Sequence, residues 1–200
     1  SVGCVITKNN SVISVGFTGF NGKPHAEYNA IKNSKVNLKK SQLYSTLEPC
    51  SHYGKTPPCI NLMTQKKIKS VFFSIKDPDI RSFNKCYKKL KKKKILVKNG
   101  YLSKNINLFY SSYKRFKINK LPFVTAKLAV SKDYFTINKN KKWITNSYSR
   151  GRVHLMRSQH DCIITSAKTI KKDNPKLNCR INGLIKTSPL PYLFSLIASA

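Results

Sequence analysis

The sequence predicts an α/β protein of two domains, with a largely parallel sheet that follows an N-terminal hairpin. Three observations support this prediction. The chain opens with two short apolar segments around an Asn-Asn turn, continues with alternating short strands and helices, and repeats such an alternation after a proline-containing segment near residue 119. Alternation of strands and helices at these lengths is typical of layered α/β domains. Two hundred residues can build one good core or two small ones.

The first expected domain, residues 1–118, begins with a hairpin over residues 2–17 that turns at Asn9 and Asn10. Pro24 favours the first turn of a helix over residues 23–34. Apolar residues at helical spacing from residue 102 to 116, with Ser103 as cap, predict the helix that closes the domain. Between them, strands and helices are expected to alternate: strand 42–47, helix 59–68, strand 70–75, helix 84–94 and strand 95–97.

The second expected domain, residues 119–200, has a shorter α/β pattern. Its expected elements are strand 123–131, a loop over 138–145, helix 147–159, strand 162–166 and a proline-containing segment over 172–180. The last stretch, 188–200, is apolar and without obvious period, so it is either a strand and helix cut off early or sequence outside the fold. Because the chain starts inside a strand and the second domain is short, we expect both ends to be incomplete.

The charge of the chain is unusual. A net charge of +32 comes from 33 lysines and 6 arginines against 7 acidic residues. Such a charge attracts polyanions, but the lysines are spread along the chain, which favours a compositional origin over a nucleic-acid footprint. Any acid that persists in so basic a chain is a candidate for a specific role. No signal peptide or membrane-spanning run is visible, so we expect a cytoplasmic protein whose cysteines are metal ligands or reduced thiols.

Two motifs carry the chemistry: "HAE", which places His25 two residues before Glu27, and "LEPCSHYGKTPPC", which holds Cys50 and Cys59. Together they offer one nitrogen and two thiolates, which is three ligands of a tetrahedral zinc with the fourth position open to water. A metal there would make hydroxide available at neutral pH, and Glu27 would transfer protons. Pro58 predicts a helix start at Cys59, where free N–H groups stabilise a thiolate.

Two other interpretations of this region stay open: a structural zinc site and a chance arrangement of these residues. A structural zinc site would need a fourth ligand, for which His52, Cys4 and Cys86 are the candidates. The cysteines outside the motif are more simply buried thiols, and these are Cys4, Cys86, Cys162 and Cys179. His154 and His160 lie in or just after a basic helix and are most simply surface or packing residues.

H-x-E followed by P-C-x-x-C is the signature of zinc deaminases, and here eight residues separate the cysteines. With that longer loop, residues 2 to about 180 resemble the bifunctional deaminase/reductase family of riboflavin biosynthesis. The resemblance implies a cytidine-deaminase-like three-layer α/β/α domain over residues 1–118, without its N-terminal helix. It implies an incomplete dihydrofolate-reductase-like α/β domain over residues 119–200.

The resemblance also implies the activity. The first domain would be a zinc-dependent aminohydrolase that acts on 2,5-diamino-6-ribosylamino-4(3H)-pyrimidinone 5′-phosphate. The second would reduce the ribosyl group to a ribityl chain with NADPH, an activity that truncation could remove. The expected partner is therefore a small phosphorylated pyrimidine, with no specific nucleic acid and no membrane, and a homo-oligomer stays open.

Carried over residue by residue, the resemblance gives one Zn²⁺ per chain held by His25, Cys50 and Cys59, with Glu27 as the catalytic proton donor and acceptor. The implied substrate-binding residues are His52, Lys55, Lys141, Arg157, Leu177 and Arg180. The implied NADPH-binding residues are Ala129, Trp143, Thr169 and Asp173. Lys127 belongs to the same strand motif as Ala129 and is a further candidate.

Two alternative functions are weighed against this one. A nucleic-acid-editing zinc deaminase would share the HAE motif and suit the charge, but not the eight-residue spacer. A basic RNA-binding module with a structural zinc would need four protein ligands and would give Glu27 no role.

Overall fold

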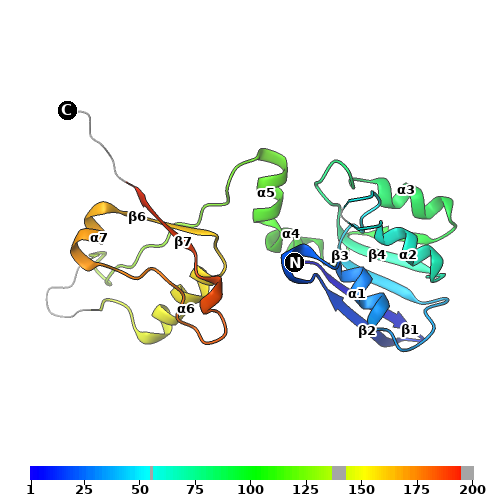
Figure 1. Ribbon diagram of the computed structural model, residues 1–200, viewed down its shortest axis with the longest axis horizontal. Helices are drawn as coiled ribbons and strands as arrows, with labels where there is room; N and C mark the ends of the chain where they lie inside the picture. Colours follow the sequence, from blue (N-terminus) through cyan, green and yellow to red (C-terminus); the bar gives the residue numbers. More distant parts are fainter. Residues whose placement is uncertain (55, 137–142, 195–200) are drawn as a thin grey trace. The chain divides into compact units, whose positions relative to one another are not determined.

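A computed structural model describes residues 1–54, 56–136 and 143–194 (Figure 1). The chain divides into two compact units, Ser1–Val124 (unit 1) and Thr125–Ala200 (unit 2). The sequence predicts a domain boundary slightly earlier in the chain, between residues 118 and 119. Within the described ranges, no helix has both the length and the apolar character that crossing a membrane would need.

Unit 1 opens with the expected hairpin. Strand β1 (Gly3–Lys8) pairs antiparallel with β2 (Ser11–Phe17), and Lys8 lies opposite Ser11. The two turn residues, Asn9 and Asn10, both have positive φ, at 50° and 59°. Two consecutive residues of this kind make a type I′ turn, whose twist matches that of the flanking strands and which asparagine tolerates well. The prediction from the Asn-Asn pair is therefore confirmed.

The hairpin forms one side of a five-stranded sheet with the strand order β2-β1-β3-β4-β5. Strand β3 (Gln42–Leu47) is antiparallel to β1 and parallel to β4 (Ser70–Ile75), which is in turn parallel to β5 (Leu96–Asn99). Every residue of β4 is buried. This confirms the prediction of a largely parallel sheet after the hairpin, in which 70–75 is a buried strand.

Three helices pack against the sheet around the main core: α1 (Ala26–Asn33), α2 (Cys59–Gln65) and α3 (Lys85–Lys92). Buried side chains from these helices meet inward-facing residues of the strands, among them Ile6, Leu43, Val71, Phe73 and Val97. The helices contact one another in sequence order, α1 with α2 and α2 with α3. The N-terminal ends of α1 and α2 thereby come close together, which is where the motif residues lie.

Two of the expected helix starts differ in the structure. Helix α1 begins at Ala26 with His25 as its N-cap, so Pro24 precedes the helix and does not form its first turn. The expected single helix over 102–116 is two helices, α4 (Ser103–Phe109) and α5 (Ser111–Asn119), and Leu102 rather than Ser103 occupies the first N-cap. The break lies at Tyr110, whose buried hydroxyl binds Thr46 Oγ1 at 2.8 Å, so core packing overrides the helical periodicity.

Gly16 of β2 is the point where α1 lies directly on the sheet. A Cβ at this position would overlap the backbone of Ala26 and Ala30. We therefore expect Gly16→Ala to push α1 off the hairpin and to lower the free energy of unfolding by about 3 kcal/mol. Hydrogen exchange of the α1 amides measures this within unit 1 alone. Gly3→Ala is the matched control, because its Cβ would sit 3.7 Å from Thr46 Cγ2 in ordinary contact, and equal protection in both variants would contradict the prediction.

Unit 2 contains helix α6 (Ser147–Ser158), strand β6 (Cys162–Ser166), helix α7 (Ala167–Asp173) and strand β7 (Leu190–Phe194), with β6 and β7 parallel. Two short 3₁₀ segments, Phe20–Gly22 in unit 1 and Ile185–Thr187 in unit 2, complete the elements. The helix and strand expected over 147–159 and 162–166 are confirmed. Part of the apolar stretch 188–200 belongs to the fold, since β7 lies in it.

The strand expected over 123–131 was wrong: this segment is in no sheet of the described chain. A strand exists through its ladder of hydrogen bonds, and among the described residues of unit 2 that ladder joins β6 and β7 alone. The expectation for the cysteines outside the motif also needs one correction. Cys4, Cys86 and Cys179 are buried as predicted, but Cys162 is exposed.

Candidate active site

Three predicted ligands meet at the N-terminal ends of α1 and α2. The Nδ1 atom of His25 lies 3.4 Å from Cys50 Sγ and 3.4 Å from Cys59 Sγ. All three ligand atoms lie within 4.8 Å of one another. Zinc with nitrogen at about 2.1 Å and sulfur at about 2.3 Å in tetrahedral geometry places these donors roughly 3.5 Å apart. The donor set and its spacing therefore fit a zinc ion.

The local fold explains how residues distant in sequence form this cluster. His25 is the N-cap of α1, so its side chain lies at the helix end, and Glu27 follows in the first turn. Cys59 is the first residue of α2, directly after the N-cap Pro58. Its backbone N–H donates to Cys50 Sγ at 3.1 Å. The helix start at Cys59 was predicted, but the N–H stabilises the sulfur of Cys50, not that of Cys59.

The electrostatics of the two cysteines differ accordingly. Hydrogen bonding from Cys59, reinforced by His25, lowers the pKa of Cys50 to about 4. The neighbouring Cys50 sulfur and burial raise the pKa of Cys59 well above its ordinary value. The hydrogen bond to Cys50 raises the pKa of His25. The lowered pKa favours the thiolate form of Cys50, which lies beside two further donors and suits a divalent cation.

Glu27 lies beside this cluster, away from bulk water. It is only 4% exposed, Cys59 Sγ donates to its Oε2 at 3.6 Å, and Ser45 Oγ lies 3.5 Å from its Oε1. Burial raises the pKa of this carboxyl group. A buried carboxyl group with a raised pKa can hold a proton near neutral pH and release it, which is the property of a general acid and base.

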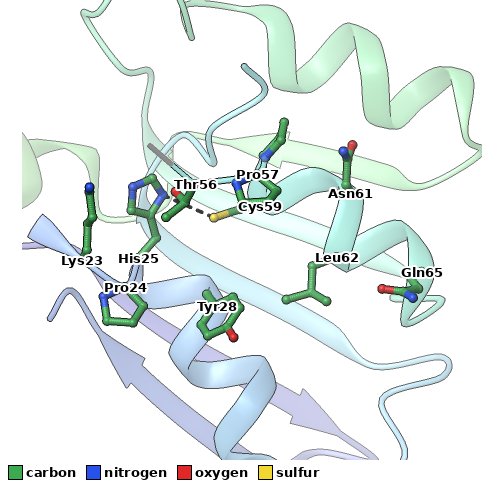
Figure 2. A pocket seen from close by; sticks show the side chains of 11 residues that line it. Lys23, Pro24, His25, Tyr28, Thr56, Pro57, Cys59, Asn61, Leu62 and Gln65 are labelled. Carbon is green, nitrogen blue, oxygen red and sulfur yellow. Dashed lines mark hydrogen bonds between the residues drawn. The ribbon is translucent and has the colours of Figure 1, made fainter. Parts of the chain in front are cut away.

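A cavity of about 720 Å³ opens next to the cluster between α1 and α2 (Figure 2). His25 and Cys59 lie at its wall. The wall also includes residues that the sequence did not predict as site residues: Lys23, Tyr28, Asn61, Leu62 and Gln65. Glu27, Cys50 and His52 are not among its lining residues. No motif marks these additional side chains, since they meet only when the two helices pack together.

Glu48, two residues before Cys50, fixes the surroundings of the cysteine loop. Its buried carboxylate accepts hydrogen bonds from the backbone N–H groups of Asp77, Asn84 and Cys86 at 3.2–3.3 Å. Because the N-cap Asn84 makes no side-chain capping bond, Glu48 supplies the cap of α3 from a distant strand end. The loop between β4 and α3 is thereby tied to the strand that leads into the cysteine loop.

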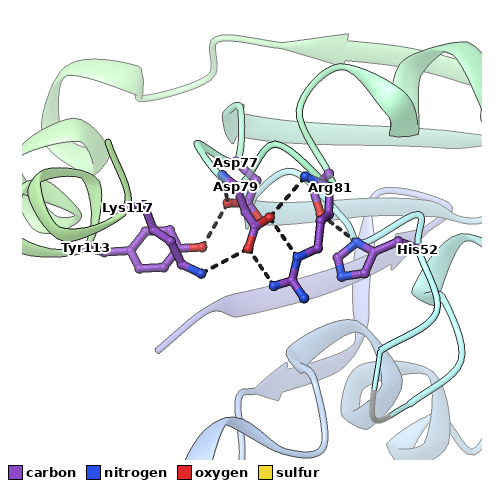
Figure 3. Close-up of polar contacts among 7 residues, drawn as sticks. His52, Asp77, Asp79, Arg81, Tyr113 and Lys117 are labelled. Carbon is purple, nitrogen blue, oxygen red and sulfur yellow. Dashed lines mark hydrogen bonds and ion pairs between the residues drawn. The ribbon is translucent and has the colours of Figure 1, made fainter. Parts of the chain in front are cut away.

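The same β4–α3 loop reaches the predicted substrate residue His52 (Figure 3). The buried Ser82 shares a hydrogen bond of 3.1 Å with His52 Nδ1. Within the loop, Asp79 binds Arg81 at 2.6 Å and Lys117 of α5 at 3.0 Å. Lys55, the other predicted residue of the cysteine loop, lies outside the described residues. His52 is therefore held by its neighbours, not free in solvent.

We expect Asp79→Asn to lower the free energy of unfolding of unit 1, and to lower it most at neutral pH. Arg81, followed by Lys117, holds the pKa of the Asp79 carboxyl well below its usual range. A lowered pKa in the folded state contributes stability above the unfolded pKa of about 3.9, and that contribution is lost as the pH falls. The variant should lose about 1 kcal/mol at pH 7, and the difference should shrink below pH ~4. Hydrogen exchange of β4 amides at both pH values measures this, with Asp133→Asn in unit 2 as control. A pH-independent difference would contradict it.

Unit 2 contains a second cavity, of about 910 Å³. It brings together six of the residues carried over by resemblance: Ala129, Trp143, Arg157, Asp173, Leu177 and Arg180. Lys127, the further candidate, also lines it. Thr169 does not; it lies in the first turn of α7, where its N–H binds the capping Ser166. Lys141 lies outside the described residues.

Each half of the chain matches a known protein family. Residues 1–75 match the model of the cytidine and deoxycytidylate deaminase zinc-binding region, and residues 122–195 match that of the RibD C-terminal domain. The riboflavin biosynthesis protein RibD of Bacillus amyloliquefaciens is 37% identical over 187 residues, which are 92% of this chain and 50% of that protein. Over more than nine tenths of its length, this chain is therefore similar to RibD proteins. Its order of zinc-binding region and C-terminal domain is the order that the resemblance predicted.

Other RibD proteins give the same result. RibD of Escherichia coli is 31% identical over 194 residues, 96% of this chain and 53% of that protein. A solved deaminase/reductase from Thermotoga maritima superposes with a TM-score of 0.90 at 34% identity, covering 96% of this chain and 55% of that one. RibD of Acinetobacter baumannii gives a TM-score of 0.86 at 32% identity, with 96% and 56% covered. The chain thus spans about half the length of the RibD proteins it matches, and the predicted fold class, deaminase-like followed by reductase-like, is confirmed.

Proposed function

We propose that unit 1 is a zinc-dependent aminohydrolase of riboflavin biosynthesis that deaminates 2,5-diamino-6-ribosylamino-4(3H)-pyrimidinone 5′-phosphate. The observation that carries this proposal is the pairing of a nitrogen and two sulfur donors with the buried carboxyl group of Glu27, 3.6 Å from Cys59 Sγ. His25, Cys50 and Cys59 would hold one zinc ion. The described residues around these atoms include no fourth His, Cys, Asp or Glu within the cluster, which leaves a coordination position for water.

Zinc bound there supplies Lewis acidity and makes a nucleophilic water available at neutral pH. Glu27 performs the proton transfers: it accepts a proton from the attacking water and delivers one to the departing amine, which leaves as ammonia. Its burial serves this role, since a carboxyl group whose pKa is raised exchanges protons more readily at neutral pH. His52, held by Ser82, is proposed as a substrate contact, and Lys55 as a second one from the same loop.

We propose that unit 2 provides part of an NADPH-dependent reductase site. Ala129, Trp143 and Asp173 would contact the cofactor, as would Thr169, while Leu177 would contact the substrate. Arg157 and Arg180 would bind a phosphate group, because guanidinium groups match phosphate geometry through paired N–H donors. Lys141 is proposed as a further substrate contact.

All six cysteines of the chain are free thiols, which supports a reducing compartment such as the cytoplasm.

One assay tests the deaminase proposal against its alternatives. The zinc-loaded chain is incubated with the diaminopyrimidinone phosphate and, separately, with tRNA or single-stranded DNA, and ammonia release is followed. We expect release from the pyrimidine alone. Release from nucleic acid alone would replace this function by an editing deaminase, and no release from either would favour a binding module. The absorbance of added NADPH then reports the reductase step, whose absence would restrict the chain to deamination.

A further inference from the structure

The cavity of unit 2 is strongly cationic. Its lining includes one negatively charged residue, Asp173, and five positively charged ones: Lys127, Arg150, Arg157, Lys176 and Arg180. Arg150 lies over the ring of Trp143, 4.9 Å from the centroid. Cations gathered around one cavity repel each other unless an anion enters. The surplus therefore favours an anionic ligand such as a phosphate monoester.

Arg157 on α6 is fixed at the wall of this cavity by one contact and offers another. Its Nη1 donates to the backbone oxygen of Asn178 at 3.0 Å. Its buried Nε–H has no hydrogen-bond partner among the described residues. A buried donor without a partner is costly, so it marks a place where a ligand oxygen would complete the bonding.

Arg180, the second arginine of the cavity, is held in a different way. It is an exposed residue of the segment between α7 and β7, and its guanidinium lies against a histidine of α6. The Nε and Nη2 atoms of Arg180 lie 3.3 and 3.2 Å from His154 Nε2. On the other side of the imidazole ring, His154 Nδ1 lies 3.1 Å from the backbone oxygen of Asn178 and 3.3 Å from the N–H of Arg180.

These partners assign the hydrogen of the ring. A carbonyl oxygen only accepts, so the 3.1 Å contact to Asn178 requires hydrogen on Nδ1, and the longer approach of the Arg180 N–H to the same atom is then not a hydrogen bond. A guanidinium only donates, so the contact to Arg180 requires a free electron pair on Nε2. We propose that His154, neutral and with its hydrogen on Nδ1, is a positioning residue that orients the Arg180 guanidinium for binding a phosphate group in this cavity. This inference deepens the proposed function of unit 2 and rests on it.

The surroundings of His154 favour the neutral ring. Burial lowers its pKa, and the charges of Arg157 on the same helix and of Arg180 on the facing segment lower it further. Asp173, the acid of the cavity at the end of α7, makes no hydrogen bond or ion pair with the ring in the described part of the chain, so it does not oppose this effect. Without the ring, the exposed Arg180 side chain would be free to take many conformations, and ordering it would weaken binding.

Binding of ribose 5-phosphate to the full chain tests the proposal through a double-mutant cycle, measured by calorimetry at pH 7.5. We expect His154→Leu to weaken binding about tenfold, the value of a lost hydrogen bond to a charged group. His154→Gln should restore most of the affinity, because an amide can accept from Arg180 and donate to Asn178 at once. The double variant His154→Leu/Arg180→Met should bind no more weakly than Arg180→Met alone.

His160 provides the matched control. It is the other histidine of unit 2 and contacts Met156 O and Thr125 Oγ1, outside the cavity. His160→Leu should therefore leave the affinity unchanged. Wild-type affinity in His154→Leu, or losses that multiply in the double variant, would overturn the inference and leave the proposed function standing. No binding by the wild-type chain would instead overturn the proposed phosphate ligand, and the inference with it.

A spectroscopic measurement keeps the proposal falsifiable even if His154→Leu does not fold. Nitrogen-15 NMR of the labelled wild-type chain should show His154 Nε2 with the shift of an unprotonated ring nitrogen and Nδ1 with that of a protonated one. A purely structural role would not require this tautomer. Hydrogen found on Nε2 would overturn the inference, because that form cannot accept from Arg180.

Discussion

Glu27→Gln is expected to lower the rate of ammonia release by about 10²- to 10⁴-fold, the usual contribution of a positioned general acid and base. Glutamine has the shape of glutamate and keeps an oxygen that can accept from Ser45, so the fold of α1 should be preserved. What it lacks is the ability to take and release a proton. The measurement is initial-rate ammonia release from the diaminopyrimidinone phosphate by zinc-loaded protein.

Two observations distinguish lost chemistry from lost structure in this variant. Zinc content should stay at one ion per chain, because His25, Cys50 and Cys59 are unchanged. Asp161→Asn, at an exposed acid of unit 2, should deaminate like the wild type and serves as a control for preparation. Undiminished ammonia release by Glu27→Gln would remove Glu27 from the mechanism and with it the present assignment of unit 1.

The candidate zinc site could be predicted from the sequence because each part is encoded locally. One residue separates His25 from Glu27, so one helix start carries both, and the prolines before Cys59 define another helix start. The pKa pattern could not be predicted in this way. It depends on the N–H of Cys59 pointing at the sulfur of Cys50, which is a consequence of how the cysteine loop folds back on α2.

Scarcity of acidic residues was a useful guide in the rest of unit 1. Besides Glu27, three of its acids have specific contacts: Glu48 caps α3 from a distance, Asp77 accepts from Tyr113 at 2.9 Å, and Asp79 joins Arg81 to Lys117. The sequence indicated that such acids would have roles but not which ones. Those roles require the ends of β3 and β4 to lie side by side, which is a property of the assembled sheet.

Local patterns were less informative in unit 2. The segment 123–131 has the apolar composition of a strand, but a strand also needs a neighbour, and composition says nothing about that. His154 was read as a surface or packing residue, since a lone histidine in a basic helix gives no signal of its own. Its contact with Arg180 joins positions 26 residues apart through the turn after α7, and only the folded chain brings them together.

Cys59→Ser is expected to weaken zinc binding by at least about 10³-fold, because a hydroxyl is a poor zinc ligand and several kcal/mol of binding free energy come from each thiolate. Competition with a chromophoric chelator measures the affinity, and elemental analysis measures the content. Cys86→Ala is the matched control: this thiol is also buried, and the free energy of unfolding should fall, but it lies outside the cluster of donors.

The pair of variants also tests whether Cys86 closes the site as a fourth ligand. If both lose zinc equally, Cys86 is a fourth ligand, the site is structural, and the coordination position that deamination needs does not exist. If Cys86→Ala keeps its zinc while Cys59→Ser loses it, Cys86 is not a fourth ligand, which is what a site with a position open to water requires. The second result is the one we expect, since His25 Nδ1 lies 3.4 Å from each of its two sulfur partners and Cys86 instead donates its N–H to Glu48.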